Sequence, residues 1–392
     1  MNVYICNDGK NKKINGFCNE NSKPIMINRN QTYKIALIGD CLAGGGAEKV
    51  HALLSVYFQK AGLEVHNCIF VDWISYDYSG SLLNLGIINP ESNFVKRKIS
   101  RFLELKTFIK ENDFDAVIDF RMRTNFGLEF LLSKIVYPNN TFYTVHSGIL
   151  EFYFPKNSLL SNLIYKNRKI VAVSKAIKNL ISHKKLAKKV SHLYNPIDLT
   201  AIATLKNKNA IEEANFILAV GRMNDEVKQF DKLILAYSKS GLPNKNIKLV
   251  LLGEGKNLTK YNELAKELGV NDSVIFKGAV ENPFPYYKKS LFTVLSSKNE
   301  GFPNVILESL AVGTPVISYD CFSGPNEIIK NNQNGILVEN QNEEKLIRAL
   351  NLFSEIDMLY AHCKQNAAES VAAFDIEIIG KQWLELLKND VS

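Results

Sequence analysis

Two glutamates in the segment "NEGFPNVILES" (299–309) have a spacing that could serve ligand binding. The apolar run "LFTVLSS" before them predicts a strand, "KNEG" predicts a turn, and Pro303 suits the first position of a helix that stops at Gly313. Glu300 then lies in the loop and Glu308 inside the helix, and eight helical residues would separate them by about 12 Å. That distance is too large for an acid/base pair acting on one bond. It suits two groups that hold the ends of one elongated ligand.

The start of the same helix offers backbone donors between the two carboxylates. The amides of Phe302, Asn304 and Val305 would face a negative group at the positive end of the helix. The neighbours of Glu308 are apolar, which indicates a partly buried acid in need of a partner rather than an ordinary surface position. A nucleotide sugar fits this layout, with sugar hydroxyls at one carboxylate, ribose hydroxyls at the other and the diphosphate between them.

Two cations in "GRMNDEVKQF" (221–230) could bind that diphosphate. Arg222 lies just past a predicted strand end, and Lys228 follows six residues later, before a helix. Arginine binds phosphate as a planar fork and lysine as a mobile point charge. Solvated loop residues are the alternative. The strand-end position, together with the glutamate segment downstream, favours a role in binding.

A glycine-rich segment, "GDCLAGGGAEKV" (39–50), joins another predicted strand to a helix. It lacks the lysine and hydroxyl of a P-loop and the third glycine of a dinucleotide fingerprint. Consecutive glycines still let backbone amides approach a phosphate at a helix start, so we expect Gly45 and Gly46 to do so. A flexible turn is the alternative.

The elements that must position these residues follow from length and patterning. A chain of 392 residues, 46% hydrophobic and 22% charged, is typical of a globular protein with two domains. Apolar runs alternate with helical patterns in two series, separated by Asn195–Pro196 and a polar stretch. The segments that contain the predicted strands are 34–39, 64–71, 114–120, 141–146 and 169–174, and then 216–223, 248–255, 274–280, 291–297 and 315–320.

Such alternation predicts parallel sheets with right-handed crossovers. We therefore expect an α/β protein made of two Rossmann-like domains whose parallel sheets face an interdomain cleft, where ligands bind beyond the carboxyl ends of the strands. The expected division is an N-terminal extension (1–33), an N-terminal acceptor domain (34–197), a C-terminal donor domain (198–373) and a last helix (374–392) that crosses back to the first domain.

The order of several motifs carries a resemblance to a known family. With E-x7-E at Glu300 and Glu308, the segments "GGGAE", "TVHSG", "YNPID", "GRMxxxxKxF" and "SLAVGTPVIS" make residues 34–390 similar to the retaining glycosyltransferases of family 4, which have the GT-B fold. The segment "SGPNEII" (323–329) resembles bacterial members that assemble polysaccharides and glycans and often use UDP-sugars.

The resemblance implies roles for individual residues. Glu308 would bind the ribose hydroxyls, Glu300 the donor sugar, and Arg222 and Lys228 would neutralise the leaving diphosphate. His146, in "TVHSG" at a strand end, would lie near the donor sugar. The implied catalytic residues are His146, Arg222, Lys228 and Glu300. The implied donor site comprises Gly45, Gly46, Gly221, Arg222, Lys228, Val280, Glu300, Gly301, Phe302, Pro303, Asn304, Val305 and Glu308.

Mechanism and cofactors follow from what the chain contains. Retention by double displacement needs a carboxylate near the anomeric carbon, and no acid here is an obvious nucleophile, so same-face transfer is preferred. Catalysis would then depend on positioning and on stabilising the diphosphate. The single DxD motif, Asp113–Asp115, precedes a predicted strand instead of following one. We therefore expect no bound metal and no cofactor.

Charge and composition suggest the partners. A net charge of +8 indicates an anionic partner, but nucleic-acid motifs are absent. Arg121 and Arg123 in "DFRMR" could meet an anionic acceptor such as a lipid diphosphate, and pairing with Asp119 is the alternative. Basic clusters at 96–101 and 184–189, with the apolar and cationic segment 152–169, fit docking on an anionic membrane leaflet. The alternative for each of these three segments is an ordinary solvent-exposed surface without a partner.

The combined hypothesis is a transferase that moves a UDP-linked hexose or N-acetylhexosamine to a lipid-linked glycan acceptor in cell-surface polysaccharide or glycoconjugate assembly. The sequence contains no apolar run long enough to span a membrane, no signal peptide and no cysteines at the spacing of metal ligands. These features favour a cytoplasmic protein that is peripheral on the inner face of the plasma membrane. Two alternatives remain open: a sugar-nucleotide epimerase of the same shape, and an inactive nucleotide-sugar-binding subunit.

Overall fold

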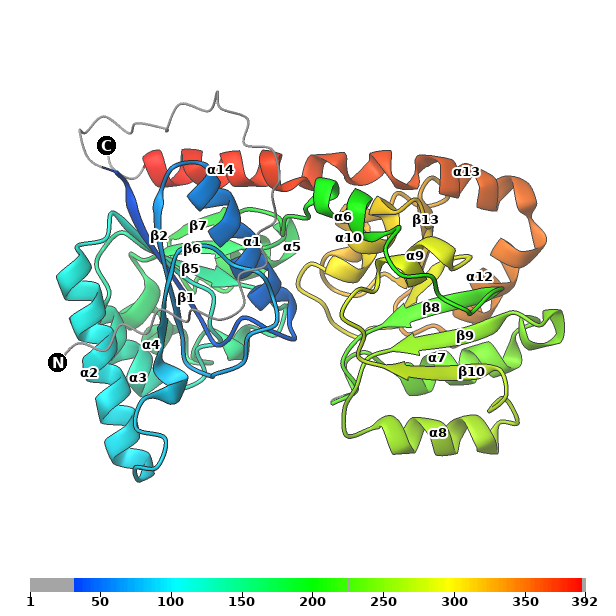
Figure 1. Cartoon of the computed structure of the whole chain (residues 1–392), viewed down its shortest axis with the longest axis horizontal. Coiled ribbons are helices and arrows are strands. Elements are labelled where there is room, and N and C mark those ends of the chain that lie inside the picture. Colours follow the sequence, from blue (N-terminus) through cyan, green and yellow to red (C-terminus); the bar gives the residue numbers. More distant parts are fainter. Residues whose placement is uncertain (1–31, 225, 390–392) are drawn as a thin grey trace.

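The structure is a computed structural model that describes residues 32–224 and 226–389. Two α/β domains lie side by side, each built around one parallel sheet (Figure 1). The expected N-terminal extension, residues 1–33, falls outside the described residues except for its last two positions.

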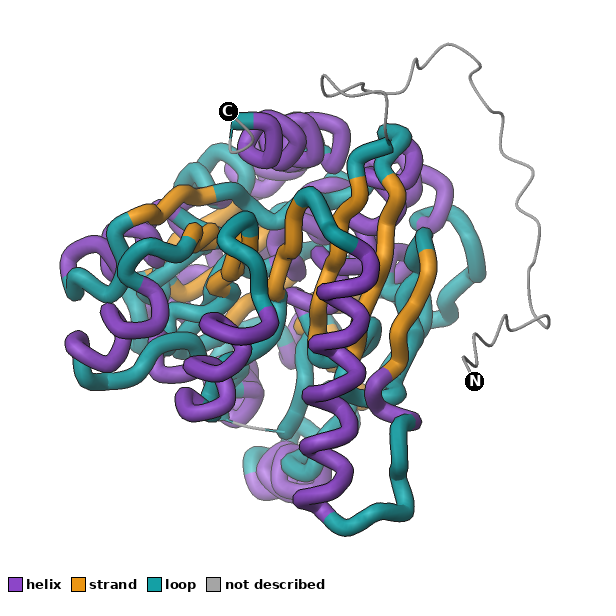
Figure 2. Tube along the Cα trace, turned by 90° about the vertical axis from the view of Figure 1, so that its left-hand side faces the viewer, coloured by secondary structure: helices purple, strands orange, loops and turns teal. Residues whose placement is uncertain are grey.

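The N-terminal domain contains a seven-stranded sheet in the order β3-β2-β1-β4-β5-β6-β7. Its strands are β1 (Lys34–Gly39), β2 (Glu64–Ile69), β3 (Ser81–Asn84), β4 (Ala116–Asp119), β5 (Thr141–Val145), β6 (Lys169–Ala172) and β7 (Lys189–His192). All of these strands pair in parallel, and they twist across the domain (Figure 2). The carboxyl ends of the strands therefore share one edge.

Helices cover both faces of this sheet. They are α1 (Gly46–Lys60), α2 (Phe94–Asn112), α3 (Phe126–Leu131), α4 (Ser158–Tyr165) and α5 (Lys175–His183), with the short turns η1 (Leu85–Ile87), η2 (Leu132–Val136) and η3 (Leu150–Phe152). Alternation along β1 divides the core, since Ile35 and Leu37 pack with α1, whereas Ala36 and Ile38 belong to the cluster that includes residues of α2, η2, α4 and α5.

The C-terminal domain contains a six-stranded parallel sheet in the order β10-β9-β8-β11-β12-β13. Its strands are β8 (Phe216–Val220), β9 (Lys248–Leu252), β10 (Val274–Gly278), β11 (Thr293–Leu295), β12 (Val316–Tyr319) and β13 (Gly335–Val338). Its helices and turns are α6 (Leu199–Leu205), α7 (Phe230–Lys239), η4 (Pro243–Lys245), α8 (Leu258–Glu267), α9 (Phe284–Lys289), α10 (Asn304–Ala311), α11 (Pro325–Ile328), α12 (Glu343–Glu355), α13 (Asp357–Ala367) and η5 (Glu369–Phe374).

The chain crosses between the domains twice, and the two crossings are hydrogen-bonded to each other. Ile197 N donates to Phe374 O (2.9 Å), and Ile376 N donates to Ile197 O (2.7 Å). After the second crossing, α14 (Ile376–Lys388) packs on α1 of the N-terminal domain (Figure 1). The last helix thus belongs to the core of the domain in which the chain began.

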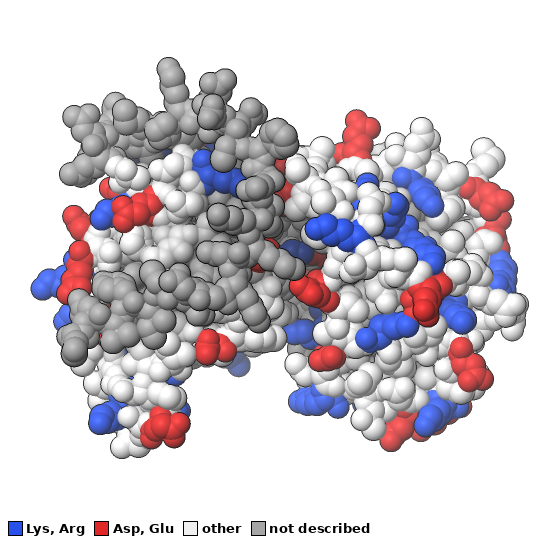
Figure 3. Space-filling view, in the orientation of Figure 1, with Lys and Arg blue, Asp and Glu red and all other residues white. Residues whose placement is uncertain are grey.

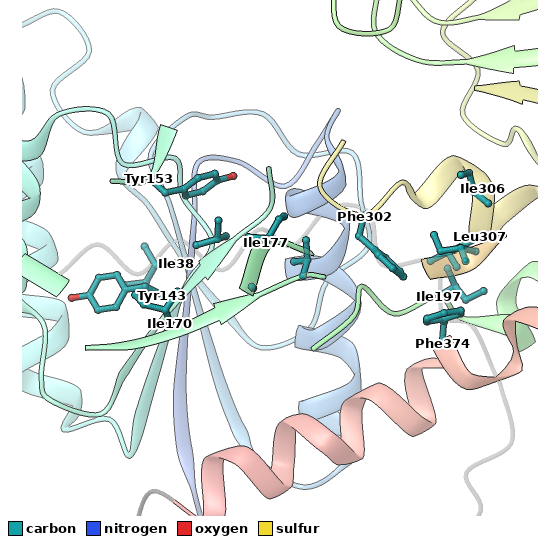
Figure 4. Close-up of a cluster of buried hydrophobic side chains, with 14 of the residues drawn as sticks. Ile38, Tyr143, Tyr153, Ile170, Ile177, Ile197, Phe302, Ile306, Leu307 and Phe374 are labelled. Carbon is teal, nitrogen blue, oxygen red and sulfur yellow. The ribbon is translucent and has the colours of Figure 1, made fainter. Parts of the chain in front are cut away.

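One hydrophobic cluster extends through both domains. Figure 4 shows Phe302 between Ile177 of the N-terminal domain and Leu307 and Phe374 on the other side. The ring of Phe302 stacks on Tyr194 at 4.8 Å and packs against Phe374 at 5.4 Å. Because this contact is apolar and buried, it fixes how the two sheets face each other.

The strand predictions are confirmed for ten segments, with ends shifted by a few residues. Three strands, β3, β7 and β13, are absent from the predicted set, and each lies at an edge of its sheet. An edge strand has only one neighbour, and β3 and β7 are four residues long and partly exposed, so their apolar pattern is weak. Of the six cysteines, the four that the structure describes are free and buried.

The packing of α14 on α1 yields a first prediction. A Cβ added at Gly380 would lie 2.4 Å from the Tyr57 ring, so Gly380→Leu should force the helices apart and lower the free energy of unfolding by about 1–3 kcal/mol. Urea denaturation followed by circular dichroism measures this. Lys381→Leu, at the adjacent exposed position, is the matched control, and equal stability of the two variants would contradict the packing.

Candidate active site

The carboxyl edges of the two sheets meet at the loop that follows β11. Gly148 N of the N-terminal domain donates to Glu300 O at 3.3 Å. A Cβ at Gly301 would lie 1.9 Å from His146 O, so only glycine permits this approach. The predicted residues His146, Glu300 and Gly301 are therefore neighbours, although they are about 150 positions apart in the chain.

Glu300 forms an ion pair within its own domain. Its Oε1 lies 2.6 Å from Nζ of Lys228, and both side chains are largely shielded from solvent. The lysine side chain passes over Gly221, where an added Cβ would come within 3.2 Å of Lys228 Cγ. The short side chain of residue 221 thus lets Lys228 reach the loop after β11.

Glu308 forms an ion pair across the domain interface. The residue is 7% exposed, on the second turn of α10. Its Oε2 accepts a hydrogen bond from Tyr287 Oη (2.9 Å), and its Oε1 pairs with Nζ of Lys49, which α1 contributes from the N-terminal domain. The partner that a buried acid requires therefore comes from the opposite side of the cleft.

Sequence reasoning did not assign Lys49 or Tyr287 to the site. The signal for Lys49 is its place one turn into α1, directly after the glycine segment. Its Nζ also lies 5.4 Å from the centre of the Phe284 ring. The signal for Tyr287 is weaker, because its contact with Glu308 depends on how α9 packs against α10.

The start of α10 presents backbone donors toward the glycine segment. Pro303 occupies the N-cap position and cannot cap the helix with a side-chain oxygen. Asn304 Nδ2 lies 3.5 Å from Gly46 O, so the first turns of α10 and α1 face each other. Phe302 also helps to join the two domains. Its ring belongs to the interdomain core, and its carbonyl oxygen accepts a hydrogen bond from Asn195 Nδ2 (3.1 Å).

The three glycines of the segment differ in what surrounds them. Gly44 has φ +72° and packs on Trp73, which leaves no room for a Cβ. Gly45 is covered by the carboxylate of Glu48, 2.0 Å from an ideal Cβ. Gly46 faces Asn304 across the interface. The compact loop thus brings α1 against the opposite domain.

Charges from both domains converge beside this loop. Burial raises the pKa of Glu48, Asp40 adds to that effect, and the exposed Arg222 opposes it from the C-terminal domain. Burial likewise raises the pKa of Asp40, whose Oδ2 accepts a hydrogen bond from Met122 N (3.1 Å). Arg222 therefore lies near the glycine loop, together with two carboxyl groups, Asp40 and Glu48, that were not predicted from the sequence.

His146 is a neutral group in this site. Burial lowers its pKa to about 3, and the charge of Arg123 acts in the same direction. Its Nε2 lies 3.1 Å from Thr144 Oγ1, while its buried Nδ1 has no partner among the described residues. A neutral imidazole with one free nitrogen can exchange a hydrogen bond with a ligand hydroxyl but cannot supply a charge at neutral pH.

Val280 follows β10 in the C-terminal domain. It is half-buried and packs against the same hydrophobic cluster as Val305, at the start of α10.

The structure corrects the acceptor assignment of Arg121 and Arg123. Both are buried, at 4% and 0% exposure. Arg121 forms ion pairs with Asp119 (2.8 Å) and Glu129 (3.2 Å), and Arg123 donates to Thr144 O (2.9 Å) among tyrosine rings. The alternative, pairing with Asp119, holds for Arg121, while Arg123 bonds to backbone carbonyls, because a guanidinium buried in a sheet core must find its partners within the protein.

Within the described ranges, no three His, Cys, Asp or Glu side chains are grouped so that they could hold a metal ion. No helix in the same ranges combines the length and apolar composition needed to cross a bilayer.

Two facing Rossmann-like domains, with charged side chains from both at their junction, are the architecture of GT-B glycosyltransferases. Two family models cover most of the chain: Glycosyltransferase Family 4 matches residues 44–201, and Glycosyl transferases group 1 matches residues 201–370. The chain belongs to glycosyltransferase family 4, which favours a transferase over an epimerase.

Relatives agree with this family, and solved structures agree with the fold. The chain is 31% identical over 376 residues (90% of this chain, 99% of the relative) to the Campylobacter jejuni N-acetylgalactosamine-N,N'-diacetylbacillosaminyl-diphospho-undecaprenol 4-alpha-N-acetylgalactosaminyltransferase. A second C. jejuni alpha-1,4-N-acetyl-D-galactosaminyltransferase, acting on a GalNAc-alpha-(1->4)-GalNAc-alpha-(1->3)-diNAcBac-PP-undecaprenol, is 27% identical (75% and 80% covered). The structure of Anabaena Alr3699/HepE in complex with UDP-glucose superposes with a TM-score of 0.71 at 18% identity, covering 91% of this chain and 99% of that one.

The interdomain ion pair yields a second prediction. Lys49→Met should leave the carboxylate of Glu308 without its cation and lower the free energy of unfolding by about 1–3 kcal/mol, less than for a fully buried pair because Lys49 keeps 27% of its side chain exposed. A double-mutant cycle with Glu308→Gln in urea denaturation measures the coupling. Lys60→Met, at the other end of α1, is the control, and strictly additive effects would rule out the pair in solution.

Proposed function

We propose that this protein transfers a hexose or N-acetylhexosamine from a UDP-sugar to a lipid-linked glycan, with retention of anomeric configuration and without a metal ion. One observation carries the proposal: two carboxylates, each matched by a lysine, flank the first turn of α10 at the point where the two domains meet. The two carboxylates can accept hydrogen bonds from hydroxyl groups at the two ends of a ligand, and the potential between them is positive.

The donor lies across this junction in the proposed complex. Ribose hydroxyls donate to Glu308, which Lys49 and Tyr287 hold in place. The diphosphate follows toward the amides of Asn304 and Val305 and toward the cations Arg222 and Lys228. The sugar then reaches Glu300, with the neutral His146 beside it from the N-terminal domain.

The chemistry proposed is same-face substitution. The bond between the anomeric carbon and the β-phosphate oxygen breaks, and the acceptor oxygen forms a bond to that carbon on the same face. The acceptor's proton passes to the departing phosphate oxygen, so UDP leaves with the electron pair and the proton. Positive charge and backbone donors that are already in position stabilise the leaving group more as its charge develops.

The acceptor and the place of action are part of the proposal. The C. jejuni relatives are named for substrates linked through a diphosphate to undecaprenol. Such an acceptor keeps its reactive sugar close to a bilayer, so we propose that this enzyme works as a peripheral protein on the inner face of the plasma membrane.

A donor panel tests the activity. Purified full-length protein is incubated with UDP- and GDP-sugars, with and without glycan acceptors, and nucleoside diphosphate release is measured. We expect slow UDP release from one UDP-sugar and acceleration by the correct acceptor. Interconversion of UDP-sugars without UDP release would indicate an epimerase, and tight binding without turnover would indicate an inactive subunit.

Stereochemistry and metal dependence are read from the same reaction. NMR of the first product should show an axial anomeric linkage from an axial donor, and an equatorial product would overturn retention. The rate should be unchanged by excess EDTA, and loss of activity restored by Mg²⁺ or Mn²⁺ would overturn metal independence.

The two carboxylate–lysine pairs should separate binding from turnover, which is the third prediction. Glu308→Gln should weaken UDP binding about 10- to 150-fold, because a charged acceptor for the ribose is lost. Lys228→Met should lower kcat about 100- to 1000-fold with a smaller change in UDP affinity, because it acts mainly on the developing charge. Calorimetry and steady-state kinetics measure the two effects.

Glu267→Gln, an exposed carboxylate on α8, serves as the control for both variants and should change neither value. Unchanged UDP affinity in Glu308→Gln would mean that the ribose does not bind at α10.

A further inference from the structure

Large apolar side chains are exposed on the face of the N-terminal sheet opposite α1 and α14. On α2, Val95, Ile99 and Leu103 recur every four residues and are 64%, 53% and 55% exposed. They share one side of the helix, whereas Leu105 and Ile109 are buried on another side. The helix therefore has one apolar side toward the core and another toward solvent. Packing within the domain explains the buried side but not the exposed one.

A second exposed apolar group lies on α4. Leu159, Leu160 and Leu163 are 78%, 53% and 55% exposed, while Ile164 and Tyr165 of the same helix are buried in the domain core. Ile135 of η2 is also 53% exposed. Four neighbouring aliphatic side chains facing outward are unusual for a surface that contacts only water.

These segments form one continuous surface. The turn η2 lies against α2, and a groove of about 470 Å³ separates η2 from α4. Asn162 Nδ2 of α4 donates to Lys185 O and Ser161 Oγ donates to Leu186 O, which attaches the basic segment 184–189 to this helix. Figure 1 shows α2, α3 and α4 next to one another on the outer side of the domain.

The charges on this surface are mostly positive. The residues that line the groove are Lys134, Asn139, Leu159, Asn162, Leu163, Ile164, Lys166, Asn167 and Arg168, which include three cations and no acid. Arg168 is held by the carbonyls of Ser133 and Pro138, but the exposed ammonium groups of Lys134 and Lys166 form no ion pair with any described residue.

The acids on these segments do not face the groove. Glu129 is buried against Arg121, Glu104 and Glu111 lie on α2, and Glu151 precedes α4. On the face of the C-terminal domain that Figure 3 shows, basic and acidic side chains are interspersed.

We propose that this surface, the outward sides of α2, η2 and α4 with the groove between the last two, docks on an anionic phospholipid bilayer. The exposed leucines and the α2 stripe enter the interface between headgroups and acyl chains, and the lysine-lined groove receives a phosphate headgroup. A second copy of the chain is a poorer occupant, because unpaired lysines in the middle of a protein interface would repel their symmetry mates.

The topology places this surface beside the cleft. Each helix that follows a parallel strand begins at the carboxyl edge of the sheet, so Val95 of α2 and Leu159 of α4 lie toward the edge that carries Gly45 and His146. A docked bilayer would therefore meet the mouth of the cleft, where a lipid-linked acceptor would enter. This last consequence rests on the proposed function, whereas the docking itself does not.

Vesicle flotation of the full-length protein is the fourth prediction and needs no substrate. The vesicles are phosphatidylcholine alone or with 30% phosphatidylglycerol. We expect binding to the anionic vesicles, much less to the neutral ones, and release at 1 M salt. Lys134→Glu/Lys166→Glu should lower the partition coefficient at least about 30-fold, and Leu159→Ser/Leu160→Ser should lower it on the anionic vesicles without changing the salt dependence.

Matched controls come from the C-terminal domain. Lys232→Glu/Lys266→Glu makes the same change in net charge on exposed helices, and Met358→Ser removes an apolar side chain that is 85% exposed. Both should bind as the original protein does. Equal binding to neutral and anionic vesicles, no binding to either, or equal losses in the controls would each overturn the proposal.

The same variants separate docking from catalysis. Transfer to a short-chain, water-soluble acceptor should be unchanged in Lys134→Glu/Lys166→Glu, while transfer to an acceptor embedded in anionic vesicles should fall. Dimer formation in sedimentation that the Leu159→Ser/Leu160→Ser variant abolishes, without vesicle binding by the original protein, would assign the surface to a second copy instead.

Discussion

The candidate site depends on the junction between the two domains. The chain crosses this junction twice, and both crossings lie side by side. The hydrogen bonds between Ile197 and the segment around Asp375 tie the two crossings together, and the rings of Tyr194, Phe302 and Phe374 pack beside them. Removing this apolar surface from water favours one arrangement of the sheets. With that arrangement fixed, the carboxyl ends of both sets of parallel strands face the same gap.

Charge compensation across the gap adds a second constraint. Glu308 is 7% exposed, and its carboxylate pairs with Lys49, which α1 contributes from the other domain. Glu327 of α11 crosses in the other direction, accepting hydrogen bonds from the backbone of Lys175 and Ala176 and from Tyr194 Oη. Polar groups from each domain are thus satisfied by the other, which links the geometry of the site to the relative position of the domains.

The two faces of the N-terminal sheet are covered in different ways. One is sealed by α1 and by α14, which returns from the end of the chain. The other is covered by helices that leave leucines and lysines exposed to solvent. Under the proposed function, this division would place the nucleotide site on one domain and the proposed docking surface on the other.

Local sequence determined the elements and most of the C-terminal site. Strands buried on both faces, such as "KIALIG" and "KLVLL", are continuous apolar runs, and Pro303 and Gly313 mark the limits of α10, so Glu300, Glu308, Arg222 and Lys228 could be placed from sequence. Three of the four edge strands were missed, and two of these, β3 and β7, are four residues long and partly exposed, so their apolar patterns are weak.

Only the tertiary structure decided which side chains face each other. Arg121 and Arg123 stand at a strand end as a ligand-binding residue would, yet they turn inward to Asp119, Glu129 and Thr144, because the direction of a side chain depends on what packs around it. The pairing of Lys49 with Glu308, 259 positions apart, likewise follows from the domain arrangement. Spacing along the chain fixes neighbours within one strand or helix, whereas contacts between elements arise only when the cores of both domains have formed.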